Sequence, residues 1–111
     1  MNPQDLVDEA TFEFTMGDHA AALAKLEEAI QLDAACFAAW HAMAEVNFDK
    51  SDYKKALEAG NIAVSIKEDD VHIHTSLSRI HMELGDKDMA EKHGARARVL
   101  GWKEQLKDSG Q

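Results

Sequence analysis

The chain has 111 residues, of which 45% are hydrophobic and 30% are charged, a composition typical of one folded domain rather than a disordered segment. Its formal net charge is −9, which argues against binding to nucleic acid phosphates, and it contains no run of about 18 apolar residues that could span a membrane. A single cysteine, Cys36, excludes an intramolecular disulfide framework.

The charge is unevenly distributed along the chain. Residues 3–36 carry one basic and eight acidic side chains, whereas residues 71–104 carry six basic and five acidic ones. The acidic N-terminal third would attract a basic segment of a partner protein, and salt would weaken that attraction. The alternative is that the charge only keeps a small protein in solution. The first residues lack the basic and apolar regions of a signal peptide, which indicates a cytoplasmic location.

Six helices are expected in chain order, because apolar residues recur at helical spacing and Gly-Asp or Ser-Asp pairs interrupt the pattern. The aspartate of each pair can accept backbone N–H bonds as the N-cap of the following helix. The expected helices span residues 4–16, 19–32, 37–49, 53–66, 71–83 and 87–100. After the sixth helix, Gly101 predicts a break. Trp102 and Leu106, four residues apart, could begin a short capping helix. Residues 105–111 would then form either a short C-terminal tail or part of this cap.

The same helical hairpin recurs every 34 residues. The columns that agree are Gly17-Asp18, Ser51-Asp52 and Gly85-Asp86; Ala22, Ala56 and Ala90; and Ala29, Ala63 and Ala97. A fixed period of this length is typical of stacked supersecondary units that form a binding surface. The small residues in these columns would let neighbouring helices approach closely. Three units therefore fill residues 3–36, 37–70 and 71–104.

In length and pattern, each unit resembles the tetratricopeptide repeat family. The middle unit matches best, with Trp40, Met43-Ala44, Ser51-Asp52-Tyr53, Ala56 and Ala63 at positions that the family favours. The resemblance covers residues 3–104 as a single domain. It implies an all-α, right-handed superhelical stack of three helix-turn-helix units.

The sequence departs from the family pattern in two respects. The closing proline of each repeat is absent, and glycine replaces the large aromatic residue late in the second helix of the second and third units, at Gly60 and Gly94. A glycine at position 60 should leave space against the third unit. We expect His74, which stands where that unit would have its tryptophan, to lean into the space.

In tetratricopeptide arrays, the first helices of successive repeats line a concave groove. The resemblance places there one row of residues per helix, at spacings of three, four and three. The rows are Gln4, Val7, Thr11 and Phe14; Ala38, His41, Glu45 and Phe48; and His72, Thr75, Arg79 and Met82. A partner peptide could lie along them, with apolar anchors on Phe14, Phe48 and Met82 and a carboxylate near Arg79. Alternatively, Phe14 and Phe48 face the packed core. A shift of one residue in the assignment of the helical faces is enough to change one arrangement into the other.

The best-known recognition device of the family is a cluster of Lys, Asn and Arg that clamps the C-terminal carboxylate of chaperone tails. The matching positions here hold Val7, Thr11, Ala42, His72 and Ser76. None of these side chains supplies the required group, so the resemblance does not extend to chaperone-tail binding.

The sequence predicts no catalytic, metal or cofactor site. It has no Ser-His-Asp or Cys-His arrangement and no glycine-rich phosphate loop, so we expect the protein not to be an enzyme. His74 and His81 share a helical face but lie about 10 Å apart along the axis, too far for one metal ion. If several of the six histidines lie near one another, protonation near pH 6 could modulate binding.

Little sequence remains to cover the last apolar edge of the array. The side chains expected at this edge are Met89, His93, Val99, Trp102 and Leu106. Repeat arrays normally need a polar terminal helix here, so the edge could pack on a second copy of the chain. The sequence therefore predicts a scaffold or adaptor that binds a partner's peptide in its groove. The alternative is a module that self-associates, for example as a homodimer.

Overall fold

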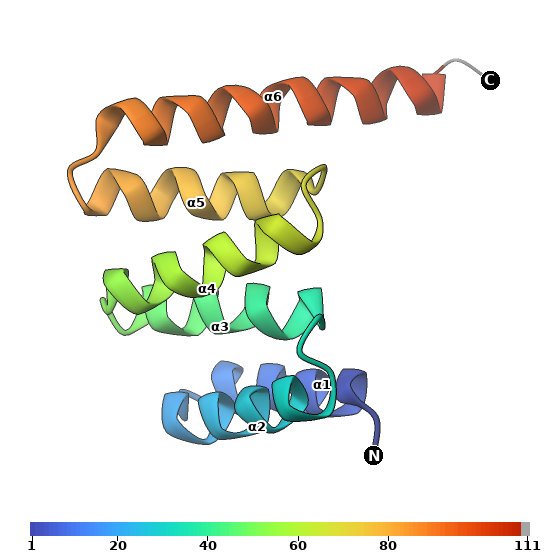
Figure 1. Cartoon of the computed structure of the whole chain (residues 1–111), viewed down its shortest axis with the longest axis vertical. Coiled ribbons are helices and arrows are strands. Elements are labelled where there is room, and N and C mark those ends of the chain that lie inside the picture. The colour runs from blue at the N-terminus through green and yellow to red at the C-terminus, as the bar shows by residue number, and fades with distance from the viewer. Residues whose placement is uncertain (110–111) are drawn as a thin grey trace.

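The computed structural model describes residues 1–109 and folds them into six α-helices (Figure 1). The helices are α1 (Pro3–Thr15), α2 (His19–Leu32), α3 (Phe37–Asp49), α4 (Tyr53–Ile66), α5 (Val71–Glu83) and α6 (Lys87–Ser109). All regular secondary structure in the described part of the chain is helical. None of these helices is long and apolar enough to cross a membrane.

The helices form three antiparallel hairpins that stack in chain order, with the N-terminal hairpin at one end and α6 at the other (Figure 1). Each hairpin packs on the next through its second helix, and the first helices α1, α3 and α5 also contact one another in sequence. The expected all-α stack of three helix-turn-helix units is therefore confirmed. The candidate site lies on the first helices of the three hairpins, α1, α3 and α5.

The turns within the hairpins have the predicted caps. Asp18, Asp52 and Asp86 each accept a hydrogen bond from the backbone N–H three residues later, with Oδ1 to N distances of 3.0, 3.3 and 3.1 Å. The residue before each aspartate takes a left-handed conformation, with φ of 84° at Gly17, 64° at Ser51 and 81° at Gly85. This shared turn reverses the chain at the same point in every unit.

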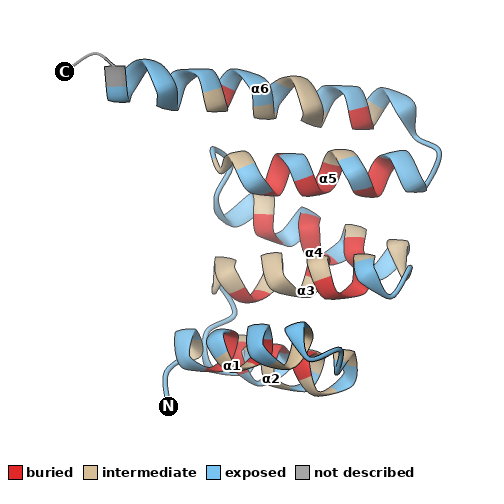
Figure 2. Ribbon diagram, turned by 180° about the vertical axis from the view of Figure 1, so that it is seen from behind, coloured by how far each residue is buried: buried red, intermediate tan, exposed pale blue. Residues whose placement is uncertain are grey.

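Small side chains form the inner layer of each hairpin. The alanines of the repeated columns are buried at Ala22, Ala29, Ala56, Ala63 and Ala90, and Ala97 is half-buried. Larger apolar residues fill the space between hairpins, and Leu26, Ile73, Leu77 and Ile80 are fully buried. Figure 2 shows the buried residues gathered on the faces that the helices turn toward one another. This pattern agrees with the predicted role of the small columns in close helix packing.

The gap above Gly60 is filled by a different residue from the one the sequence predicted. A Cβ atom at Gly60 would lie 2.8 Å from Cδ2 of Leu77, so the leucine occupies the space that the glycine leaves. His74 points elsewhere, because its Nε2 is 2.7 Å from the carbonyl oxygen of Glu68. The prediction for His74 is wrong. Leu77, which follows His74 by three residues on α5, is the side chain that packs over Gly60 of α4.

Helix α6 does not break at Gly101. It continues to Ser109, and because it runs antiparallel to α5 its C-terminal part projects well beyond the N-terminal end of α5 (Figure 1). Gly101 has no positive φ, unlike Gly17 and Gly85, and no atom outside its own helix lies close to its missing Cβ. A helical glycine is less favourable than alanine by only about 1 kcal/mol, and the strong helix formers that follow it are sufficient to continue the helix. The expected break is therefore wrong.

Candidate peptide-binding groove

The rows predicted on α3 and α5 meet in the structure. Arg79 Nη1 lies 3.6 Å from Glu45 Oε1, and the guanidinium carbon lies 4.5 Å from the centroid of the Phe48 ring. One turn earlier, His41 Nε2 is 3.2 Å from Ser76 Oγ. The three contacts share one face of the two helices, so the expected spacing places these side chains along a common surface.

A cavity of about 220 Å³ opens between α1 and α3. It is lined by Ala10, Thr11, Phe14, Leu26, Ala42 and Glu45. Ala10 and Leu26 are buried and form its apolar floor, whereas Thr11 is exposed at its rim. We call this space the α1–α3 cavity. Its lining combines apolar walls with two polar side chains, which is the usual composition of a pocket that accepts one side chain of a ligand.

The two phenylalanines of the groove rows differ in position. Phe14 is half-buried and lines the α1–α3 cavity, and its ring also contacts His19 edge-on at 5.7 Å. Phe48 is half-buried between Arg79 and Tyr53. Phe14 is therefore accessible from the cavity, while one face of Phe48 is covered by the chain itself.

The remaining residues of the rows lie at three different depths. Val7 is only 6% exposed and belongs to the N-terminal core. His72 and Thr75 are exposed on α5, where the Thr75 hydroxyl donates to the Val71 carbonyl oxygen. Met82 is 58% exposed at the end of the same helix. The predicted apolar column is thus discontinuous.

Two electrostatic features define the groove. Arg79 already pairs with Glu45 across α3 and α5, so a ligand carboxylate at Arg79 would compete with an internal one. Burial lowers the pKa of His41, an effect that the Glu45 and Asp70 carboxylates oppose and the His72 imidazole reinforces. His41 is consequently neutral at pH 7 and acts through its hydrogen bond to Ser76 rather than as a cation.

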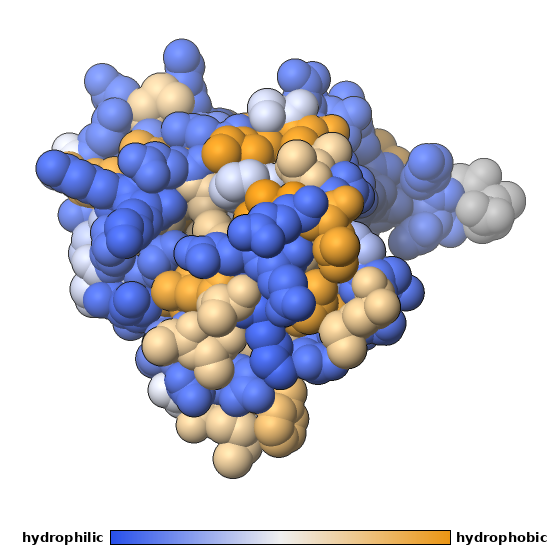
Figure 3. Space-filling model, turned by 60° about the horizontal axis from the view of Figure 1, so that its bottom comes forward, coloured by the Kyte–Doolittle hydropathy of each residue, from blue (hydrophilic) through white to orange (hydrophobic). Residues whose placement is uncertain are grey.

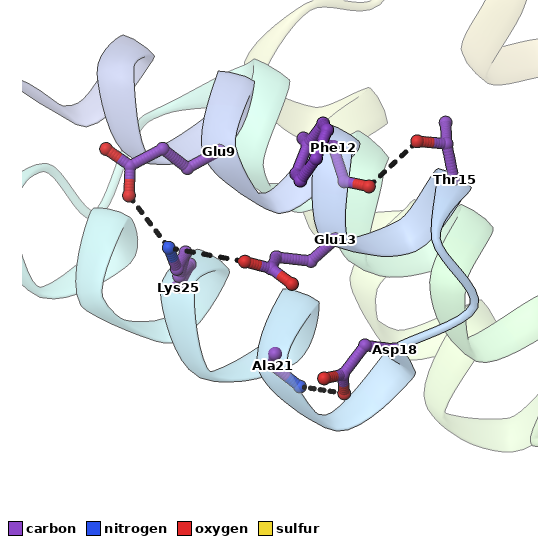
Figure 4. Close-up of polar contacts among 7 residues, drawn as sticks. All are labelled: Glu9, Phe12, Glu13, Thr15, Asp18, Ala21 and Lys25. Carbon is purple, nitrogen blue, oxygen red and sulfur yellow. Dashed lines mark hydrogen bonds and ion pairs between the residues drawn. The ribbon is translucent and has the colours of Figure 1, made fainter.

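Part of the acidic charge of the first hairpin is neutralised within the hairpin. Lys25 Nζ lies 2.8 Å from Glu9 Oε1 and 3.7 Å from Glu13 Oε1, which joins α2 to α1 (Figure 4). The hydrogen bond to Glu9 is the largest cause of the raised pKa of Lys25, whose side chain remains in contact with solvent. The carboxylates available to a basic partner segment are therefore fewer than the sequence count suggests.

The residues expected at the C-terminal edge divide between two surfaces. Val99, Trp102 and Leu106 are 43%, 63% and 54% exposed and share one face of α6, and we call them the terminal apolar stripe. Met89 and His93 instead line a second cavity, of about 520 Å³, between α4, α5 and α6. We call it the α4–α6 cavity.

One arrangement was not expected from the sequence. His93 of α6 lies between His74 and His81 of α5, with ring centroids 5.2 and 5.5 Å away. The seven-residue spacing of His74 and His81 already indicated a shared face, but the third ring comes from another helix. Within residues 1–109, no group of three or more His, Cys, Asp or Glu side chains is placed to hold a metal ion.

The face seen in Figure 3, where the N-terminal end of the stack comes forward, is mostly hydrophilic, and separate apolar patches lie among the charged and polar side chains. No family model matches the sequence, and no curated protein matches it. Solved structures do match. The crystal structure of MamA has a TM-score of 0.88 at 22% identity and covers 94% of this chain and 61% of its own.

Two further solved structures are similar. The second TPR of Spaghetti (RPAP3), bound to the HSP90 peptide SRMEEVD, has a TM-score of 0.87 at 15% identity, covering 90% of this chain and 93% of its own. A chain of the CopN–Scc3 complex has a TM-score of 0.81 at 15% identity and covers 98% of this chain and 69% of its own. The chain spans about three fifths of the length of MamA. These similarities show that the fold is that of a three-repeat tetratricopeptide array, as the sequence predicted.

Proposed function

We propose that this protein is a non-catalytic adaptor that binds a peptide segment of a partner protein in the groove formed by α1, α3 and α5, with residues 3–104 as the binding domain. The α1–α3 cavity is the observation that carries the proposal, because it is an apolar pocket with a polar rim on the face formed by the predicted rows. The Spaghetti domain is bound to an HSP90 peptide and CopN is found with Scc3, which supports protein binding in general terms. We also propose a cytoplasmic location, with which the free thiol of Cys36 is consistent.

The lining of the groove favours one class of peptide. An apolar side chain would enter the α1–α3 cavity and contact Phe14 and Leu26. A basic residue next to it would meet Glu45, which is 34% exposed and bonded only on one side by Arg79. This combination fits the acidic character of the first two units. A peptide anchored by a carboxylate at Arg79 is less favoured, because Glu45 already occupies that position.

Filling the cavity is expected to weaken peptide binding without unfolding the protein. Peptides selected from a random display library on the wild-type chain should carry an apolar residue beside Lys or Arg. Replacing half-buried Ala42 with Phe would occupy the α1–α3 cavity and displace the apolar side chain, whose burial contributes about 1.5–3 kcal/mol. Affinity measured by calorimetry should therefore fall by about tenfold or more.

The matched control is Ile62→Ser, which alters an exposed side chain on α4, a helix that does not line the α1–α3 cavity. It should leave the affinity unchanged, and circular dichroism should show equal helicity for all three proteins. Selected peptides that bind Ala42→Phe as tightly as the wild type, or a library that yields no binders, would remove the groove proposal.

The terminal apolar stripe supports a second candidate function, which is self-association. Val99, Trp102 and Leu106 lie on one exposed face of α6, and residues 71–111, with seven basic and six acidic side chains, have a net charge of only +1, so two copies could meet there with little repulsion. The wild-type protein should then show a concentration-dependent dimer in light scattering. Trp102→Ser should shift it to the monomer, whereas Met82→Ser, at a similarly exposed position on α5, should not. A monomer at every concentration would contradict this candidate.

A further inference from the structure

Three imidazole rings join the last two helices. His93 of α6 stacks on His81 of α5 with an interplanar angle of 6° and lies against His74 of α5 with an angle of 30°. His74 and His81 are each only 7% exposed, and His93 is half-buried at the edge of the α4–α6 cavity. We call these residues the histidine stack. It is a cluster of titratable groups that the proposed groove does not use.

The hydrogen atoms of the stack can be assigned from its partners. His74 Nε2 lies 2.7 Å from the Glu68 carbonyl oxygen, which can only accept, so this nitrogen must donate. Neutral His74 then has a lone pair on Nδ1, and that atom lies 2.9 Å from Nδ1 of His93. His93 must therefore donate from Nδ1. A chain of two hydrogen bonds runs from α6 through α5 to Glu68, just after α4, and it requires at least one of the two rings to be neutral.

Protonation of both rings is incompatible with this arrangement. A proton on His74 alone can be accommodated, because neutral His93 can carry its hydrogen on Nε2 and accept from His74 Nδ1, whereas protons on both rings place N–H groups on both facing Nδ1 atoms and break the bond between α5 and α6. A proton added to His93 would keep that bond but would put a charge between two other imidazoles. Burial is the largest cause of the lowered pKa of His93, and the His74, His81 and Lys92 side chains lower it further.

The charges around the stack are of both signs. From α6, Lys92 and Arg96 line the same cavity, and Arg96 is paired with Asp69 at 3.0 Å. Glu68, which follows α4, also lines the cavity and is exposed to solvent. At the other end of the stack, Asp86 Oδ2 lies 3.9 Å from His81 Nδ1. His19 is on α2 and pairs with Asp49 at 2.7 Å.

We propose that the histidine stack is an acid-sensitive latch, which holds α6 on α5 while its imidazoles are neutral and loosens α6 when they are protonated. The lowered pKa of His93 means that the unfolded hairpin binds more protons than the folded one as the pH falls. The stabilisation is therefore fully present above the ordinary histidine value of about 6.5 and is lost progressively below it. Because the projecting end of α6 carries the terminal apolar stripe, acid would also loosen the helix that presents that surface.

Amide hydrogen exchange at about pH 7.5 and about pH 5.5, corrected for the intrinsic rates and with a chelator present, tests the latch. In the wild type, protection of α6 amides should fall severalfold more than protection of α1 amides, because only α6 is held by the histidine stack. In His93→Asn the side-chain amide can still donate to His74 but cannot titrate, so the additional loss of α6 protection should be largely removed. His72→Gln, at an exposed position on α5, should respond like the wild type.

A second measurement covers the case in which His93→Asn folds poorly. Imidazole resonances of the wild type, followed against pH, should show His93 titrating below the ordinary histidine value of about 6.5, and the loss of α6 protection should follow the His93 curve. His81→Phe keeps a stacked ring without a titratable group and should weaken the response. The latch is overturned if protection falls equally in all helices, if His93→Asn folds and responds as the wild type does, or if His93 titrates without a change in α6.

Discussion

Leu77→Ala is expected to lower the free energy of unfolding by about 3 kcal/mol, as measured by urea denaturation followed by circular dichroism. Leu77 is fully buried between α4 and α5, and its Cδ2 occupies the space above Gly60. Removing it leaves a cavity that no side chain at position 60 can close. Small domains are stable by only about 5–15 kcal/mol, so this loss would be a large fraction of the total.

The control for this prediction is Leu32→Ala, which removes the same atoms from a side chain that is 57% exposed. Its effect should stay within about 0.5 kcal/mol. A second comparison tests the contact itself. Gly60→Ala should stabilise the Leu77→Ala variant by about 1 kcal/mol through helix propensity, but should give no such gain in the wild type, where its Cβ meets Leu77. Additive effects would contradict the proposed packing.

Ala44→Leu is expected to destabilise the protein by about 2 kcal/mol, because it forces a larger side chain into a fully packed layer. Ala44 has no exposed surface and shares a core cluster with Ala56, Ala63 and Leu77. The same layer in the third unit is close enough for Ser78 Oγ to donate to the Ala90 carbonyl oxygen at 2.7 Å, which shows how little room separates the paired helices.

Thermal unfolding followed by circular dichroism measures this effect. Ala24→Leu, at an exposed position on α2, makes the same chemical change and should alter stability by less than about 0.5 kcal/mol. A loss for Ala44→Leu that is no larger than for Ala24→Leu would show that the small columns are not needed for close approach of the helices.

Features that depend on local sequence were predictable. The aspartate caps at Asp18, Asp52 and Asp86 and the turns before them depend on four or five consecutive residues, and all three form as expected. The alanines that recur every 34 residues could also be identified as packing positions, because the same small residue type appears at the same place in all three units. The exception is Gly101, where a local rule for helix ends predicted a break that the propensity of the following residues overcomes.

Features that depend on how two helices cross were less predictable. Gly60 indicated a space, but the sequence could not decide between His74 and Leu77, since both lie on the faces of α5 that turn toward the interior. Of the groove rows, which stay a prediction, Arg79 and Glu45 contact each other and Phe14 lines the α1–α3 cavity, whereas Val7 lies in the core. The histidine stack depends on the register of α6 against α5, and a single sequence contains no direct signal for it.

The stacking of the hairpins in chain order also determines how the chain reaches this structure. In the described part of the chain, each helix contacts only helices one or two places away from it, so no contact requires distant segments to find each other. A chain of such low contact order should fold rapidly, within microseconds to milliseconds, with little entropy lost in closing loops. It should also unfold from its ends. We therefore expect α6, which has a neighbour on one side only, to open first while the N-terminal hairpins remain folded.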